Sequence, residues 1–88
     1  MREMVLTVGV ENFTIRYFRT QGEIEADGIK TRVFGICAEK YIGDVQEEAS
    51  DAGFISSDMA YVDGLITTLG SNTVTPMTLC EVLDDIVV

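Results

Sequence analysis

Histidine is absent from this chain of 88 residues. Its absence removes the commonest general base and the commonest metal ligand, together with Ser-His and Cys-His nucleophile systems. The Gly-x-Ser-x-Gly, P-loop and dinucleotide-binding fingerprints are absent as well. We therefore expect no catalytic residue, no cofactor and no metal site.

Cysteine is scarce, and long hydrophobic runs are missing. Cys37 and Cys80 lie 43 positions apart and form neither a CxxC nor a metal-ligand pattern. Their apolar surroundings predict two small buried hydrophobic side chains in a reduced, cytoplasmic setting. No apolar run approaches the roughly 20 residues that span a bilayer, and the first residues do not resemble a targeting segment.

Basic residues are missing from the second half of the chain. All six lie in the first forty positions, where six acids balance them, whereas residues 41–88 carry nine acids and no base. The net charge is −9. Because phosphate binding needs a basic surface, we expect neither nucleic acid nor an anionic membrane as a partner.

Alternating apolar residues predict strands in the first two thirds of the chain. The segment Gln21–Lys30 is polar and contains Asp27 and Gly28, so we interpret it as a mobile loop, with frayed strand ends at its borders as the alternative. Gly35, inside the third strand, indicates a bulge or a close backbone approach. The fourth segment has an ambiguous period, and a helix over Val45–Ala52 is the alternative. The predicted strands are Met4–Val8, Phe13–Arg19, Thr31–Lys40 and Val45–Ile55.

Two helices are predicted after the strands. The first begins at Ser56, Ser57 and Asp58 and ends at Gly70, with a stripe made by Met59, Val62, Ile66 and Leu69. The second begins with Thr75 as an N-cap, whose hydroxyl would accept a backbone N–H, and with Pro76 at the first helical position. Its apolar stripe comprises Leu79, Val82, Leu83 and Ile86.

Strands followed by helices predict one α+β domain over residues 1–88, with an antiparallel sheet of about four strands and two C-terminal helices packed on one face. The stripe of the last helix should pack against Phe13, Ile15, Phe34 or Ile36. The opposite sheet face would carry Phe18, Val33 and Cys37, and it would be either exposed or buried in a homodimer.

The closing segment NTVTPMTLCEVLDD, residues 72–85, resembles the C-terminal signature of a family of short uncharacterised Firmicute proteins, a domain of unknown function. Members typically end in Asn-x-Val-x-Pro-x-x-Leu-x-Asp-Val-Ile-Glu-Asp, and here Glu81 replaces the first Asp. The segments FISSDMAYVDGLITTL and Phe34-Gly35-Ile36 are also similar, whereas residues 41–53 depart from the pattern. The resemblance implies the same order of elements and brings no known activity or ligand.

Acidic residues supply the remaining candidates. Asp44, Glu47, Glu48 and Asp51 lack the ligand order of a calcium loop, and we interpret them as a solvated surface. Glu81, Asp84 and Asp85 are different, because acids near a helix C-terminus are unfavourable. We interpret them either as a frayed, solvated terminus or as a site that binds a basic partner. We therefore expect a protein-interaction or regulatory module without catalysis. The alternatives are a small-ligand or cation-binding protein that uses surface carboxylates, and an enzyme that works with carboxylates at a subunit interface.

Overall fold

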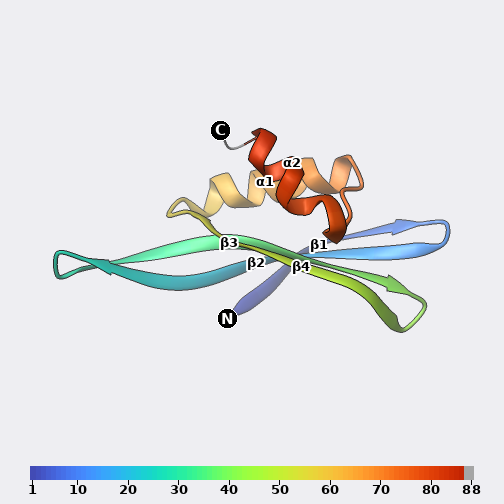
Figure 1. Ribbon diagram of the computed structural model, residues 1–88, viewed down its shortest axis with the longest axis horizontal. Helices are drawn as coiled ribbons and strands as arrows, with labels where there is room; N and C mark the ends of the chain where they lie inside the picture. Colours follow the sequence, from blue (N-terminus) through green and yellow to red (C-terminus); the bar gives the residue numbers. More distant parts are fainter. Residues whose placement is uncertain (87–88) are drawn as a thin grey trace.

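The computed structural model describes residues 1–86 and shows a four-stranded antiparallel sheet with the helices on one side (Figure 1). Each strand pairs with the next one in the sequence. The elements are β1 (Arg2–Val10), β2 (Phe13–Ala26), β3 (Ile29–Ile42), β4 (Val45–Ser56), α1 (Met59–Ser71), a short 3-10 helix η1 (Pro76–Thr78) and α2 (Leu79–Ile86). The predicted α+β class is confirmed, and the fourth segment is a strand, not a helix.

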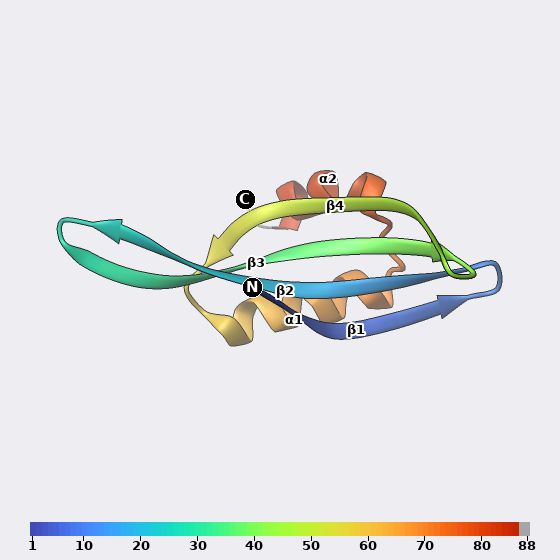
Figure 2. The same ribbon diagram turned by 90° about the horizontal axis from the view of Figure 1, so that it is seen from below.

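The two faces of the sheet differ in what covers them. On the covered face, Ile15 and Tyr17 of β2 and Ile36 of β3 are fully buried beneath the helices. Helix α1 lies over the strands from β1 onward, and α2 lies beside β4 (Figure 2). The other face, called the open face below, has no helix over it among the described residues. The buried core consists of Ile15, Tyr17, Phe34, Ile36, Ala38, Val62, Leu65, Ile66, Leu69, Val74, Leu79 and Leu83.

A tyrosine fixes the link between the helices to the middle of the covered face. The Tyr17 hydroxyl donates a hydrogen bond to the carbonyl oxygen of Val74 at 2.6 Å. Burial raises the pKa of Tyr17 to about 12, because a phenolate would lose its hydration there. The turn before η1 is therefore tied to β2 through a buried polar contact.

The segment predicted as a mobile loop forms a hairpin arm. Strand β2 runs to Ala26 and β3 starts at Ile29, so that Gln21–Lys30 consists of strand ends around a two-residue turn. Asp27 and Gly28 have φ angles of 54° and 78°, as the type I′ hairpin turn requires. The arm projects beyond the rest of the sheet (Figure 1), which explains the 48 Å length of the molecule.

The arm has no third strand beside it. Strand β1 pairs with β2 only as far as Thr20, and β4 pairs with β3 only from Phe34 onward. Residues 22–33 therefore form a two-stranded ribbon with both edges unpaired within the described chain.

The close approach predicted at Gly35 is confirmed. A Cβ atom at Gly35 would overlap the backbone carbonyl of Gly53 in β4. Gly53 has a φ of 75°, which favours glycine, and the β3–β4 register shifts on both sides of Gly35. The bulge therefore brings the two strands together at a point where no side chain fits.

The helices depart from prediction at their ends. Met59 and Ile86 were assigned to the buried stripes, but both are exposed, and Leu65 joins the α1 stripe instead. The Thr75 hydroxyl accepts no backbone N–H bond and lies 3.2 Å from the hydroxyl of Thr78. The segment after it is a 3-10 turn, and the α-helix begins only at Leu79.

The two cysteines have different environments. Cys37 is buried, as predicted, whereas Cys80 is exposed, contrary to prediction. Leu79 is fully buried, whereas the Sγ atom of its neighbour Cys80 lies 4.0 Å from the Ser50 hydroxyl of β4 at the exposed border of the sheet.

Candidate functional site

The open face of the sheet is the largest surface that the strand registers leave without a helix. The uninterrupted β2–β3 register shows which residues belong to this face: Phe18 lies beside Cys37, and Gly22 lies beside Val33. The same face receives Arg2 and Met4 from β1, and Asp51 and Phe54 from β4. Side chains from all four strands therefore contribute to one surface.

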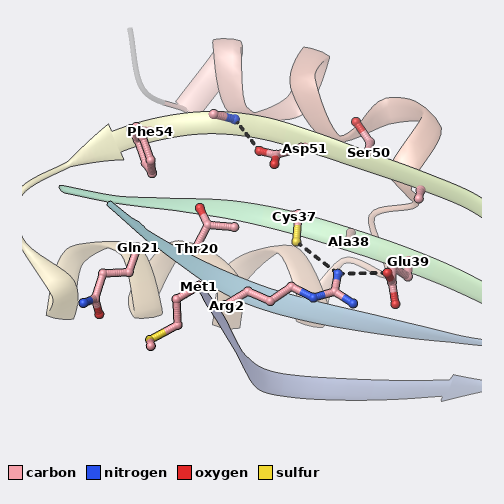
Figure 3. Close-up of a pocket in the computed structure, with 12 residues that line it drawn as sticks. Met1, Arg2, Thr20, Gln21, Cys37, Ala38, Glu39, Ser50, Asp51 and Phe54 are labelled. Atoms are coloured by element: carbon pink, nitrogen blue, oxygen red, sulfur yellow. Dashed lines mark hydrogen bonds and ion pairs between the residues drawn. The ribbon is translucent and has the colours of Figure 1, made fainter. Parts of the chain in front are cut away.

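A depression occupies the centre of the open face (Figure 3). It has a volume of about 830 Å³ and lies between Arg2 at one side and Phe54 at the other. Thr20, Cys37 and Asp51 also line it. Its size is in the range of ligand and peptide sites, but it is open to solvent along much of its length.

An ion pair borders the depression. The Arg2 guanidinium donates to the Glu39 carboxylate at 2.9 Å and lies 4.0 Å from the centre of the Phe18 ring. Tyr41 donates to the other Glu39 oxygen at 2.7 Å, and Arg16 lies over the Tyr41 ring. Burial opposes ionisation of Glu39, but the hydrogen bonds from Tyr41 and Arg2 outweigh it, so that its pKa lies below the ordinary value.

Two further polar side chains in the depression differ in their hydrogen bonding. The Asp51 carboxylate accepts the Gly53 N–H at 2.8 Å, which holds the bulge of β4 in place. The Thr20 hydroxyl oxygen is buried, and among the described residues it finds no hydrogen-bond partner. Burial raises the pKa of the Cys37 thiol, because the thiolate would be poorly solvated there. The raised pKa keeps Cys37 in the less reactive thiol form.

The arm extends the open face with an apolar row. In the β2–β3 register Ile24 lies beside Thr31 and Ala26 beside Ile29, all on the same side as Gly22 and Val33. The reverse side of the arm carries the charged cross-strand pairs Glu23–Arg32 and Glu25–Lys30. The arm is therefore amphipathic, although it has no core of its own to cover.

Exposed apolar residues of this surface lie on the arm and at its root, in addition to Met4 on β1. Ile24 is 52% exposed, Ile29 is 67% exposed and Phe54 is 54% exposed. The Phe54 ring lies over Gly22, where any Cβ atom would collide with it. The apolar row therefore continues from Phe54, beside the depression, to Ile29 at the tip of the arm.

The residues predicted as a dimer surface lie on the open face but are already covered. Phe18, Val33 and Cys37 are only 7–8% exposed, because side chains of the same sheet shield them. The homodimer stays a prediction, but these three side chains would contribute little new contact area to it.

The predicted acidic partner site lies far from the open face in the fold. Glu81, Asp84 and Asp85 are all exposed on α2. Glu81 and Asp85 border a groove of about 470 Å³ between the end of α1 and α2, whereas Asp84 does not line it. The structure therefore brings two of the three acids to one groove.

The carboxylates of β4 are used structurally. Glu48 forms an ion pair with Lys40 at 3.4 Å and accepts the Met77 N–H at 3.3 Å, which connects β4 to η1. Among residues 1–86, no group of three or more Asp, Glu, Cys or His side chains is placed to hold a metal ion. The same residues include no helix with the length and apolar character needed to cross a membrane.

The sequence contained a signal for the arm that our interpretation missed. Asp-Gly flanked by alternating residues is a strong hairpin indicator, and Ile24, Ala26 and Ile29 alternate with charged residues on both sides of it. Arg2, Glu39 and Phe54 were also missed, because only the register brings β1, β3 and β4 to one depression.

Comparison with known proteins gives one positive result. No curated protein and no solved structure matches the chain. A sequence model described as a family of unknown function (DUF6514) matches residues 2–88. Because the match spans the four strands and both helices, the chain belongs to this family of unknown function.

Proposed function

We propose that this protein is a protein-interaction module without catalysis, and that the open face with its arm is the binding surface. The observation that carries the proposal is a row of exposed apolar side chains on one side of the molecule. Ile24 and Ile29 lie on the ribbon with unpaired edges, and Phe54 of β4 lies at its root. A two-stranded hairpin is at best marginally stable alone in water. An arm of this kind gains stability when its apolar side is covered by a partner.

The ionisable groups of the depression support binding rather than chemistry. A nucleophilic cysteine needs a lowered pKa, whereas burial raises the pKa of Cys37. A general acid at neutral pH needs a raised carboxyl pKa, whereas the pKa of Glu39 is lowered. At neutral pH these shifts favour the thiol form of Cys37 and the carboxylate form of Glu39, which suit a hydrogen-bonded binding surface rather than a catalytic one.

The test uses two variants of the same arm. Ile24→Ser with Ile29→Ser removes the apolar side, and Glu23→Ser with Glu25→Ser is the matched control on the reverse side. Each tagged chain is used to capture proteins from native lysate, followed by mass spectrometry. We expect the captured protein to be lost with the isoleucine variant and retained with the control. Equal recovery by both variants would contradict the proposed surface.

The acidic end of α2 is a second candidate binding site. Its support is the exposure of Glu81, Asp84 and Asp85, two of which border a groove. Such a site would take a basic partner surface, and its binding would weaken as salt increases. The salt dependence separates it from the apolar surface of the arm.

A further inference from the structure

We propose that the partner of the open face is a second copy of this chain, with the apolar side of each arm lying in the depression of the other protomer. This inference rests on the proposed function and names its partner. A two-fold interface requires that one surface carry both of the features that meet. Here the projecting row and the depression share one face, and Phe54 belongs to both.

Charge favours this face over the rest of the surface. The chain has a net charge of −9, so two copies repel one another over most approaches. Of the described charged residues, the strand registers place Arg2, Arg16, Glu39 and Asp51 on the open face, two of each sign. These four charges sum to zero, so a second copy meets less repulsion at this face than over the acidic helices.

One carboxylate of this set, Asp51, lacks a cation among residues 1–86 of its own chain, and Arg2 is exposed enough to reach a second copy. Arg2 and Glu39 satisfy each other inside one chain, and the side chain of Arg2 is still 48% exposed. Asp51 is bound by a backbone N–H and has no cation within ion-pair distance among the described residues. Arg2 of one protomer and Asp51 of the other are therefore suitable partners at the rim of the depression.

The available area is sufficient. A standard stable interface takes about 800 Å² from each partner. The open face and arm run along the 48 Å length of the molecule (Figure 1). Exposed apolar side chains lie from Phe54, beside the depression, to Ile29 at the tip of the arm. Association would also protect the free edges of the arm, which otherwise present unpaired backbone groups to solvent.

The first experiment measures the oligomeric state of the purified chain by sedimentation equilibrium between 1 and 100 µM. We expect a dimer that strengthens as salt rises, because salt screens the repulsion between two acidic chains. Ile24→Ser with Ile29→Ser should raise the dimer dissociation constant at least tenfold, since a two-fold interface loses each isoleucine twice. Glu23→Ser with Glu25→Ser should leave a dimer as strong as that of the wild type, or a stronger one.

The outcomes separate this inference from the function on which it rests. A chain that stays monomeric at 100 µM and in high salt would overturn the second copy as partner. If that monomer still captured another protein through Ile24 and Ile29, the interaction function would stand with a different occupant. A dimer unaffected by the isoleucine variant would also overturn the inference, because its interface would lie elsewhere.

The second experiment locates the arm on the partner. A spin label is attached to Glu25→Cys, on the charged side of the arm, in a Cys80→Ser background, since Cys37 is buried. The labelled chain is mixed with ¹⁵N-labelled wild type, so that every broadened amide belongs to the other protomer. We expect broadening at Ala49, Asp51 and Gly53 in the depression. Broadening restricted to α1 and α2 would overturn the arrangement.

Discussion

The covered and open faces belong to the same strands, but they bury their apolar residues by different means. On the covered face, Ile15, Tyr17 and Ile36 are fully buried because the helices lie over them. On the open face, Phe18 and Cys37 are nearly as inaccessible without a helix. Neighbouring residues of one strand point to opposite faces and are buried to a similar extent, but different parts of the molecule cover them.

The covering on the open face comes from side chains of the sheet itself. Arg2 extends over the Phe18 ring and ends on Glu39, and Phe54 lies over Gly22. A long basic side chain can cover apolar surface with its stem while its charged end stays in water. The comparison shows that alternation in the sequence identifies two faces, but not what covers either of them.

The largest expected loss of stability follows from truncating a side chain of α2 that is buried against the covered face. Leu83→Ala should lower the free energy of unfolding by about 2–5 kcal/mol, because Leu83 is buried in the core and a cavity would remain. Ile86→Ala is the matched control on the same helix, and as an exposed position it should change stability by less than about 0.5 kcal/mol. Urea denaturation of both variants measures this, and equal losses would contradict the assignment of the covered face.

The polar contact of the covered face gives the next largest effect. Tyr17→Phe should cost about 1–3 kcal/mol, because the buried Val74 carbonyl loses its hydrogen bond. Tyr61→Phe, at an exposed position on α1, is the control and should be nearly neutral.

The same tyrosine predicts the alkaline pH dependence of stability. Burial raises the pKa of Tyr17 to about 12 in the folded state, above the value of about 10 for an unfolded tyrosine. Its contribution is therefore complete below pH 10 and is lost as the pH rises toward 12. Thermal melts from pH 8 to 11.5 should show a smaller loss for Tyr17→Phe than for wild type. Parallel curves would contradict the buried phenol.

Much of the covered face could be predicted from the sequence, because its pattern repeats over several residues. Phe34, Ile36 and Ala38 alternate along β3, and Val62, Ile66 and Leu69 recur at helical spacing, as the structure confirms. The last helix was less accessible to prediction. After Pro76 the chain makes a 3-10 turn, and the eight residues of α2 provide only Leu79 and Leu83 as buried contacts. Ile86 is the last residue of α2 and is exposed, although its spacing from Leu79 and Leu83 places it in the same stripe.

The open face could not be predicted to the same extent. Its apolar residues were placed correctly opposite the core, but their covering by Arg2 and Phe54 depends on the register between strands that are distant in sequence. The arm was missed because the segment was judged by its overall polarity, and the charged residues of one side masked the alternation of Ile24 and Ile29 on the other. The Asp27-Gly28 turn would have identified it.

The ion pair tests whether covering by side chains also stabilises the open face. Glu39→Gln should cost about 1 kcal/mol, a modest value because Arg2 is half exposed. Since the folded state lowers the pKa of Glu39, its contribution is present above about pH 4.3 and is lost as the pH falls through the lower folded value. Unfolding measured from pH 2 to 7 should show a shallower acid loss for Glu39→Gln than for wild type. An identical slope would show that the ion pair does not stabilise the face.

The smallest effect per residue on stability is expected at the acidic end of α2, which lies outside both faces. Asp84 and Asp85 lie in the last turn, where the helix carries partial negative charge, and Asp85 follows Glu81 at i,i+4. Asp84→Asn with Asp85→Asn should therefore raise stability by about 0.3–1 kcal/mol for each site.

The binding effect of this double variant separates a basic partner from a second copy. If the acidic end docks on a basic surface, the variant binds that partner more weakly and with a smaller salt dependence. Glu23→Gln with Glu25→Gln removes the same two charges from the reverse side of the arm and controls for net charge. A dimer held by the open faces should instead strengthen with both variants, because each one reduces the repulsion between acidic chains. Titration calorimetry of a captured partner and sedimentation of the purified chain measure the two cases, and unchanged affinity and salt slope for that partner would remove the acidic end as a binding site.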